Sequence, residues 1–445
     1  MSDVLAEESL QEVRKPHYLG LLLTILFGGI VLFFNFSHWE LATHAFIICF
    51  VSLIIWQLCE PFADAAQWIG DALHMPSSVR GATLDAVASS LPEFFIGIFF
   101  VLTAVLHQNS ASLQSESGYG ATVATCAGSA IYNMILIPAF VALVVSYKRK
   151  ERPTIDIEDN VIARDGIAFL LCEGVLLIAL HYQLLTWWMG IVFIAMYCVY
   201  ILFLYNDWKK FETIKQIAKQ REDHHAESIR QRLQEEGHSF SLTLIEKALN
   251  ELQRSNEPHV EREKNHSFLF FNMIKIRLNA FSSWGIVGVV TLFIAGTSYI
   301  LVHSTHILAE QLHVPTFFLA VIVVAAASSV PDTFVSIAAA MRGDDSGAVS
   351  NVFGSNIFNI CVCLGVPLII NSGINNWEPV SLMQNGKPME GLFGLQVLLG
   401  LLTTITLAMM WHNRQITRTK AIWFCGLYGI FITYAVAGSL GLINV

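Results

Sequence analysis

The chain has 445 residues, of which 54% are hydrophobic and only 14% are charged, and its formal net charge is −9. Soluble domains usually carry about 25% charged residues, so this composition argues against a soluble enzyme, and the apolar content argues against intrinsic disorder. The negative net charge, with no basic stripe outside loops, also argues against nucleic-acid binding. The composition predicts a protein that crosses a membrane several times.

Eleven apolar stretches are long enough to cross a bilayer as helices, which takes about 20 residues each. The bilayer core offers no water to unpaired backbone groups, so helical spans are expected. The predicted fold class is therefore an all-α polytopic membrane protein. In chain order, the expected spans are 18–36, 41–59, 80–106, 120–146, 165–183, 185–205, 283–303, 316–341, 347–371, 391–411 and 420–442.

The basic residues between the spans predict the orientation, because Lys and Arg concentrate in cytoplasmic loops. With Arg14 and Lys15 in the cytoplasm, only Lys387 of the 26 Lys and Arg residues falls on the other side. The hydrophilic segment 206–267 is then a cytoplasmic linker with one or two helices. We expect an integral protein of the plasma or inner membrane. The linker carries one apolar stripe at helical spacing, formed by Phe240, Leu242, Leu244, Ile245, Leu249 and Leu252.

An internal repeat relates two parts of the chain at an offset of 239 residues. Ser-Ser-Leu-Pro-Glu at 89–93 aligns with Ser-Ser-Val-Pro-Asp at 328–332, and Gly-Ser-Ala-Ile-Tyr-Asn at 128–133 matches Gly-Ser-Asn-Ile-Phe-Asn at 354–359. Each copy holds five spans, an odd number, so the second copy crosses the membrane in the opposite sense. Such inverted repeats are typical of secondary transporters, which bind their substrate near the midplane. The expected domains are the N-terminus with one extra helix (1–40), the first repeat (41–205), the linker (206–267) and the second repeat (268–445).

Two carboxylates, Glu93 and Asp332, each follow a proline in the middle of a span. An ionisable group at membrane depth is expensive and marks a functional site. Two facing carboxylates repel each other unless a cation lies between them, and a divalent ion cancels both charges. Nearby side chains offer only oxygen, which favours hard cations such as Ca²⁺ and Na⁺ over Zn²⁺ or Cu²⁺. These candidate ligands are Ser89, Ser90, Ser328 and Ser329 in the carboxylate helices, and Ser129, Asn133, Ser355 and Asn359 in the partner helices.

The prolines also affect the backbone. Pro92 and Pro331 each remove a backbone donor and clash with the carbonyl four residues earlier. The carbonyls of Ala88 and Ala327 are therefore expected to be free of helical hydrogen bonds. Free carbonyls are tolerated at membrane depth only beside a cavity or a ligand.

The two motifs resemble the α-repeats of the cation/calcium exchanger superfamily. Pro-Glu in the first copy, Pro-Asp in the second and Gly-Ala-Thr at 81–83 are most similar to the potassium-dependent sodium/calcium exchangers. The resemblance covers about 60–442 without the linker. It implies a ten-helix core of two inverted repeats, Ca²⁺ extrusion driven by Na⁺, and ion binding by the ten Ser, Asn, Glu and Asp residues named above. It also implies that the backbone carbonyl oxygens of Ala86 and Ala325 are ligands of Na⁺.

Three polar residues do not follow from the motif pattern that the family shares. Asn359 stands where the family usually has an Asp tied to K⁺, so the sequence predicts that K⁺ is not required. Asp85 lies two turns before Glu93 and is a third ion ligand, a proton site, or a group hydrated from the cytoplasmic end, which is the favoured interpretation. Glu173 lies outside both motifs and is expected to be hydrogen-bonded within the helix bundle.

The leading hypothesis is an antiporter that exchanges Ca²⁺ for Na⁺ by alternating access. It needs the lipid bilayer but no cofactor beyond the transported ions, and one chain suffices for the site. The nearest alternative is H⁺/Ca²⁺ exchange, and a cation channel is a more distant one. An enzyme is disfavoured, because no span offers a nucleophile with a base placed to activate it.

Overall fold

The structure, a computed structural model, describes residues 18–442 apart from 107–117, 151, 222–225, 236–239, 241–243, 247, 250–265, 385–386, 390 and 441. In this part of the chain, ten helices are long and apolar enough to cross a membrane. They coincide with ten of the eleven expected spans, and the all-α polytopic class is confirmed. The remaining expected span, 165–183, is the shorter helix α8 (Ile167–Tyr182), which continues the π-helical segment η2 (Ile162–Gly166).

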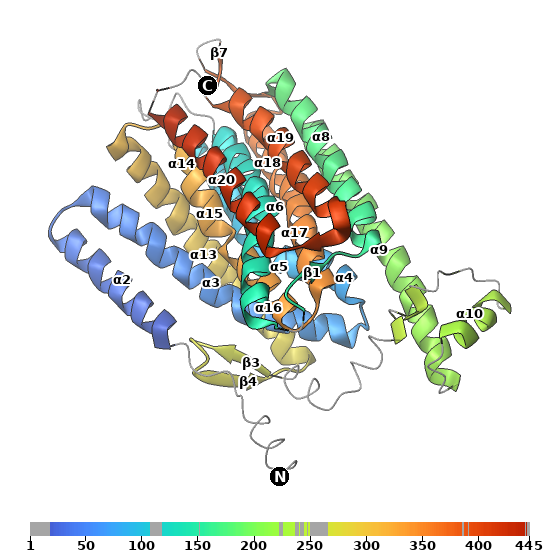
Figure 1. Ribbon diagram of the computed structural model, residues 1–445. Helices are drawn as coiled ribbons and strands as arrows, with labels where there is room; N and C mark the ends of the chain where they lie inside the picture. The colour runs from blue at the N-terminus through green and yellow to red at the C-terminus, as the bar shows by residue number, and fades with distance from the viewer. Residues whose placement is uncertain are drawn as a thin grey trace.

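The first half of the chain begins with α2 (Tyr18–Phe36) and α3 (Glu40–Ala72), which pack together at one edge of the bundle (Figure 1). The other first-half helices are α4 (Ser77–Arg80), the π-helical η1 (Gly81–Asp85), α5 (Ala86–Leu106), α6 (Gly118–Lys148), α7 (Asp159–Val161), η2, α8, α9 (Trp187–Arg221) and α10 (Ala226–Glu235).

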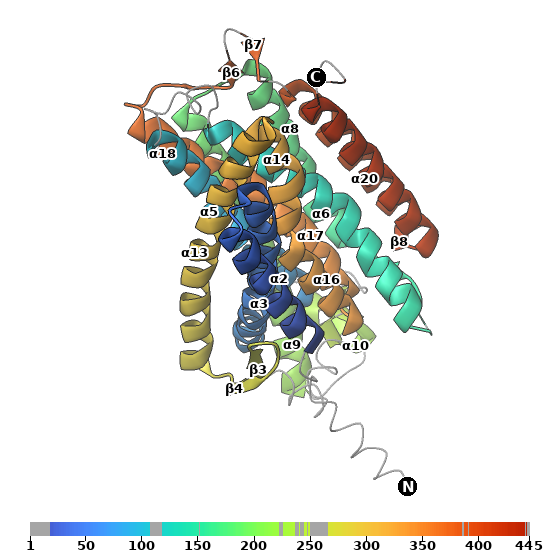
Figure 2. The same cartoon turned by 90° about the vertical axis from the view of Figure 1, so that its left-hand side faces the viewer.

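The second half begins with α13 (Ala280–Leu312), which lies against α3 (Figure 2). Its other helices are α14 (Thr316–Leu319), the π-helical η3 (Ala320–Val324), α15 (Ala325–Ser328), α16 (Val330–Met341), α17 (Asp345–Phe358), the π-helical η4 (Asn359–Cys363), α18 (Gly365–Ile374), α19 (Leu392–Trp411), the 3₁₀ turn η5 (His412–Arg414) and α20 (Arg418–Ser439).

Within the described residues, four short antiparallel strand pairs connect segments at the ends of the bundle. The β3–β4 hairpin lies at the same end as α10, called here the α10 end, and β7 lies at the opposite end (Figure 1). The pairs are β1 (Ile155–Asp156) with β8 (Gln415–Ile416), β2 (Leu184–Leu185) with β5 (Val380–Ser381), β3 (His266–Leu269) with β4 (Ile274–Arg277), and β6 (Met383–Gln384) with β7 (Lys387–Pro388).

Equivalent helices of the two halves make equivalent contacts. Helix α6 packs against α19 and α20, and its counterpart α17–α18 packs against α8 and α9. A Cβ atom added to Gly128 would overlap the carbonyl oxygen of Val321, and one added to Gly354 would overlap that of Ala82. Val321 and Ala82 are themselves 239 residues apart, as are η1 and η3. The packing thus follows the internal repeat seen in the sequence.

The two prolines act differently on their helices. Helix α5 continues through Pro92, whereas in the second half α15 ends at Ser328 and α16 begins at Val330. Ser329 lies between them with φ −85° and ψ −1°. The expected disturbance therefore becomes a helix break only in the second copy, where Pro331 lies in the first turn of the new helix and its missing N–H costs no helical bond.

The linker contains a small hydrophobic core of its own. Helix α9 extends well beyond the expected span and packs against α10. Of the predicted apolar stripe, Ile245 and Leu249 are buried in this core with Phe211, and Phe240 and Leu244 pack against it. Leu242 and Leu252 lie outside the described residues, as do Arg14 and Lys15. The proposed domain boundaries stay a prediction.

Candidate functional site

Glu93 and Asp332 approach the same face of α6, and neither side chain has any exposed surface. The Ser129 hydroxyl donates to Glu93 Oε1 at 3.1 Å, and Asn133 Nδ2 donates to Asp332 Oδ2 at 3.2 Å. Residues four apart on a helix lie one above the other, with Cβ atoms about 5–6 Å apart. The two carboxylates are therefore held about one helical turn from each other.

The second half of the chain completes the surroundings of both carboxylates. The Ser355 hydroxyl donates to Asp332 Oδ1 at 2.6 Å, and the Ser329 hydroxyl lies 3.4 Å from Glu93 Oε1. Asn359 Nδ2 donates to the Ser129 hydroxyl at 3.1 Å, which places Asn359 beside the Glu93 carboxylate. Each carboxylate thus contacts side chains from both halves of the chain.

The remaining candidate ligands line the same region. Ser89 Oγ lies 3.3 Å from the Ala86 carbonyl and 3.5 Å from Ser355 Oγ. In the second copy, the Ser328 hydroxyl donates to the Ala325 carbonyl at 3.2 Å. The two carbonyls that the resemblance implicates are therefore each next to a serine hydroxyl of the motif.

Three oxygens of the site are buried without a hydrogen-bond partner among the described residues: Glu93 Oε2, Ser90 Oγ and Asn133 Oδ1. Within the same part of the chain, no ion pair joins Glu93 or Asp332 to a basic side chain. Buried oxygens and charges without partners are costly, so the arrangement favours a positively charged ligand. Ca²⁺ takes six to eight oxygen ligands, which this set of carboxylates, hydroxyls and amides can supply.

Asp85 lies outside this cluster and is paired with a base. Its carboxylate accepts from Arg80 Nε at 3.2 Å, and its side chain is buried. Arg80 also reaches Asp344 Oδ2 at 3.0 Å and Asp71 Oδ1 at 3.6 Å. The favoured interpretation of Asp85 as a hydrated group is wrong, because its side chain is buried and its carboxylate is paired with Arg80.

Arg80 and its partners Asp85, Asp344 and Asp71, called here the Arg80 cluster, join the two halves of the chain near the α10 end. Arg80 belongs to the first half and Asp344 to the second. A second link lies nearby, where Arg149 Nη1 contacts Asp345 Oδ1 at 2.6 Å and the Ala340 carbonyl at 3.0 Å. The sequence offered no signal for these pairs, since their members are about 200 or more residues apart.

Asn351 is a positioning residue that the motif comparison did not assign. Its Nδ2 donates to Ser336 Oγ at 2.9 Å and lies 3.5 Å from the Asp332 backbone carbonyl. It thereby joins α17 to the helix that carries Asp332. The available signal was the difference between the two copies, because Thr125 stands at the equivalent place. Its hydroxyl donates within its own helix, to the Ala121 carbonyl at 3.0 Å.

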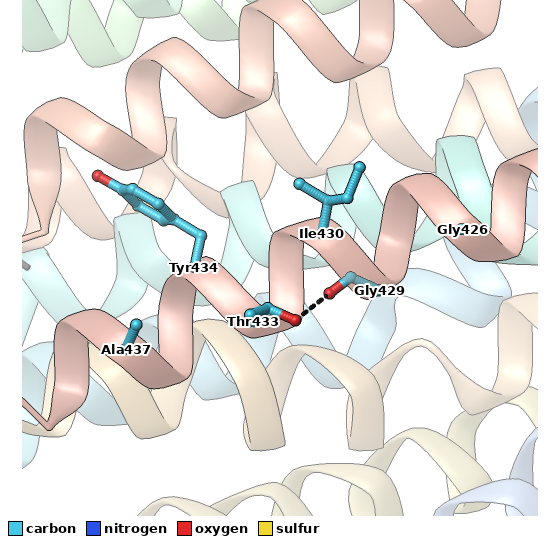
Figure 3. Close-up of a pocket in the computed structure, with 6 residues that line it drawn as sticks. All are labelled: Gly426, Gly429, Ile430, Thr433, Tyr434 and Ala437. Atoms are coloured by element: carbon cyan, nitrogen blue, oxygen red, sulfur yellow. Dashed lines mark hydrogen bonds between the residues drawn. The ribbon is translucent and has the colours of Figure 1, made fainter. Parts of the chain in front are cut away.

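A separate groove lies along α20 (Figure 3). Its volume is about 540 Å³, and the hydroxyl of Thr433 donates to the Gly429 carbonyl within it at 2.8 Å. None of the candidate ion ligands lines this groove. The lining residues are Gly426, Gly429, Ile430, Thr433, Tyr434 and Ala437.

Comparison with known proteins identifies one family. The family described as "Sodium/calcium exchanger protein" matches residues 43–206 and 282–437, which covers most of the chain. A curated relative, the human sodium/potassium/calcium exchanger 5, is 25% identical over 406 residues, covering 81% of this chain and 74% of its own length. The chicken sodium/potassium/calcium exchanger 2 is 32% identical over 145 residues, but the match spans only 22% of that protein.

Two solved structures resemble the fold. The sodium-calcium exchanger NCX_Mj has a TM-score of 0.50 at 17% identity, with 86% of this chain and 95% of that chain covered. The native YfkE structure has a TM-score of 0.55 at 14% identity, with 95% and 99% covered. At these identities the likeness concerns the fold alone. It agrees with the all-α polytopic architecture described above.

Proposed function

This chain belongs to the sodium/calcium exchanger protein family and is a membrane cation exchanger, and we propose that it exchanges Ca²⁺ for Na⁺ by alternating access, with the ions held between Glu93 and Asp332. The observation that carries this proposal is the pair of fully buried carboxylates without a basic partner among the described residues. One Ca²⁺ neutralises both carboxylates. Two Na⁺ that move in the opposite direction carry the same total charge as one Ca²⁺.

The origin of the ligands supports alternating access. The Glu93 carboxylate is contacted by Ser129 from the first half and Ser329 from the second, and Asp332 is contacted by Asn133 and Ser355 in the same mixed way. A movement of one half against the other changes both coordination shells at once. Inverted-repeat transporters open their site to each side of the membrane by such movements.

We propose that the α10 end faces the cytoplasm. Three arginines lie there, and each forms an ion pair with an aspartate. The pairs are Arg80 with Asp344, Arg149 with Asp345, and Arg414 with Asp159. Clusters of Arg and Lys beside membrane helices favour the cytoplasmic side. The linker helices α9 and α10 then lie in the cytoplasm as well.

The test replaces each carboxylate by its amide. Glu93→Gln and Asp332→Asn, reconstituted in liposomes, should each reduce Na⁺-driven ⁴⁵Ca²⁺ uptake below about a tenth of wild type, a loss of at least ~1.4 kcal/mol. The reason is that a single carboxylate leaves half of the Ca²⁺ charge unbalanced in a buried site. Glu40→Gln is the matched control, because Glu40 is an exposed glutamate at the start of α3 that accepts a bond from Gln311.

Unchanged melting temperatures would show that the two variants still fold. Retained uptake in either folded variant would contradict the assignment of the site. Uptake that follows an imposed H⁺ gradient and ignores Na⁺ would instead favour H⁺/Ca²⁺ exchange. Flux that runs only down the Ca²⁺ gradient, whatever the other ions do, would favour a channel.

A further inference from the structure

A further buried carboxyl group lies between α8 and α19, outside the proposed ion site. Glu173 on α8 is 2% exposed, and its Oε1 lies 2.7 Å from the hydroxyl oxygen of Thr403 on α19. This contact confirms the expectation that Glu173 is hydrogen-bonded in the bundle. The two helices belong to different halves of the chain, and each packs against an ion-site helix: α19 against α6, and α8 against α17.

The hydrogen bonds of Thr403 reveal the charge state of Glu173. The same hydroxyl oxygen lies 2.6 Å from the backbone carbonyl of Leu399. Both distances are those of O–H···O hydrogen bonds, yet a threonine hydroxyl has only one hydrogen. A backbone carbonyl and an ionised carboxylate can only accept. If Glu173 were ionised, one of the two short contacts would therefore bring two oxygens together without a hydrogen between them.

A protonated Glu173 resolves the conflict. The acid O–H donates to Thr403 Oγ1, and the threonine hydroxyl donates to the Leu399 carbonyl, so each short contact contains one hydrogen. The other carboxyl oxygen, Glu173 Oε2, is buried and has no hydrogen-bond partner among the described residues. Burying the carbonyl oxygen of a neutral acid without a partner costs less free energy than burying a carboxylate oxygen, which carries part of a negative charge.

The neighbouring elements offer Glu173 no stabilising charge. Helix α19 carries no titratable side chain from Leu392 to Trp411. The Cys172 thiol on α8 faces the Cys361 thiol of η4 at 3.5 Å. In η2, the Arg164 guanidinium is paired with Asp165 at 2.6 Å. The other titratable groups on α8 are His181 and Tyr182 at its end. On the packed elements they are Cys363 on η4, Asp345 at the start of α17, and on α9 Tyr197, Cys198, Tyr200, Tyr205 and the charged residues from Asp207 onward. Tyr200 donates to Asp165 at 3.0 Å, and Asp207 accepts from Arg164 at 3.0 Å.

We propose that Glu173 is a proton-binding site, and that its neutral acid form fastens α8 to α19 across the two halves of the exchanger. The bound proton is structural and is not exchanged for Ca²⁺. An ionised Glu173 could only accept the single hydrogen of the Thr403 hydroxyl, so one of the two short contacts of that hydroxyl would be lost. The unpaired charge would also weaken the packing of two helices that cover the ion-site helices. Exchange should therefore tolerate a neutral hydrogen-bond donor at position 173 and fail when the acid ionises.

The direct test is infrared spectroscopy of the reconstituted protein at neutral pH. The wild type should show the C=O stretch of a protonated carboxylic acid, and that band should disappear in Glu173→Gln. In the control Glu40→Gln, only carboxylate bands should be lost, because Glu40 is exposed. Loss of carboxylate bands alone in Glu173→Gln would overturn the proposal. This measurement does not depend on which ions the protein exchanges.

Flux and stability measurements test the fastening role, and the flux part rests on the proposed Ca²⁺/Na⁺ exchange. Glu173→Gln keeps a donor for Thr403, so its ⁴⁵Ca²⁺ uptake at neutral pH should stay within about twofold of wild type. Wild-type uptake should fall at alkaline pH, whereas that of Glu173→Gln should not. Glu173→Met, which is neutral but cannot donate, should melt at a lower temperature than Glu173→Gln. Equal melting of these two variants, or the same alkaline loss in Glu173→Gln and wild type, would contradict the role.

Discussion

Replacing Arg80 by Gln should destabilise the protein strongly. The Arg80 guanidinium contacts three carboxylates, those of Asp85, Asp344 and Asp71, and its own side chain is 7% exposed. Glutamine is too short and carries no charge, so all three contacts are lost together. The most damaging consequence concerns Asp85, whose side chain is 8% exposed and then has no ion-pair partner, since the charge of Arg342 acts on it only from a greater distance.

The magnitude follows from burial. Removing one partner of a buried ion pair costs about 3–5 kcal/mol, because the other charge remains in a poorly hydrated place. Asp344 and Asp71 are 18% and 27% exposed. Contacts with more exposed partners are worth about 0–1 kcal/mol each, so they add little. At roughly 2 °C per kcal/mol for a large domain, the melting temperature should fall by about 6–10 °C.

The assay is thermal unfolding in detergent, followed by tryptophan fluorescence. Arg418→Gln is the control, since Arg418 is exposed at the start of α20 and no ion pair among the described residues includes it. In the double variant Arg80→Gln, Asp85→Asn, part of the stability should return, because the unpaired charge has been removed. A melting temperature for Arg80→Gln equal to that of the control, or no recovery in the double variant, would refute the reasoning.

Other properties follow from the ion site and the helix packing. Na⁺-driven Ca²⁺ flux should persist when choline replaces K⁺, because Asn359 lacks the charge that would hold a second cation, and Asn359→Asp should introduce K⁺ stimulation. If three Na⁺ exchange for one Ca²⁺, an imposed potential should change the flux, at about 2.3 kcal/mol per net charge and 100 mV; a flux indifferent to potential would indicate an electroneutral cycle. Gly128→Ala should lower stability by about 1–3 kcal/mol through overlap with the Val321 carbonyl, whereas Gly429→Ala, with open space around it, should not.

The clustering of the two carboxylates with neutral oxygen-bearing side chains could be predicted from the sequence, because the signal is local and occurs twice. Pro-Glu at 92–93 and Pro-Asp at 331–332 sit in apolar spans, where any ionisable group is exceptional. The repeat also fixed which helices correspond, and the carbonyl contacts of Gly128 and Gly354 follow that correspondence.

Features that depend on contacts between distant segments could not be predicted. Arg80 pairs with Asp85 only five residues away, but it also contacts Asp344, which is 264 residues further along the chain, and that contact is part of what buries the group. The proposed protonation of Glu173 rests on a hydroxyl on α19 that lies at hydrogen-bond distance from two oxygens but has only one hydrogen to donate. The break at Ser329, absent at the equivalent Ser90, likewise depends on how each helix packs and not on the shared Ser-Ser-x-Pro pattern.

The central claim is that Na⁺ drives Ca²⁺ across the membrane through the site between Glu93 and Asp332. The most direct measurement is ⁴⁵Ca²⁺ uptake into liposomes containing the wild-type protein, with outward gradients of Na⁺, K⁺ or H⁺ imposed one at a time. We predict uptake against the Ca²⁺ gradient with Na⁺ alone, and its loss in Glu93→Gln and Asp332→Asn. Uptake driven by H⁺ or K⁺ without Na⁺, or no uphill uptake under any of the three gradients, would contradict the claim.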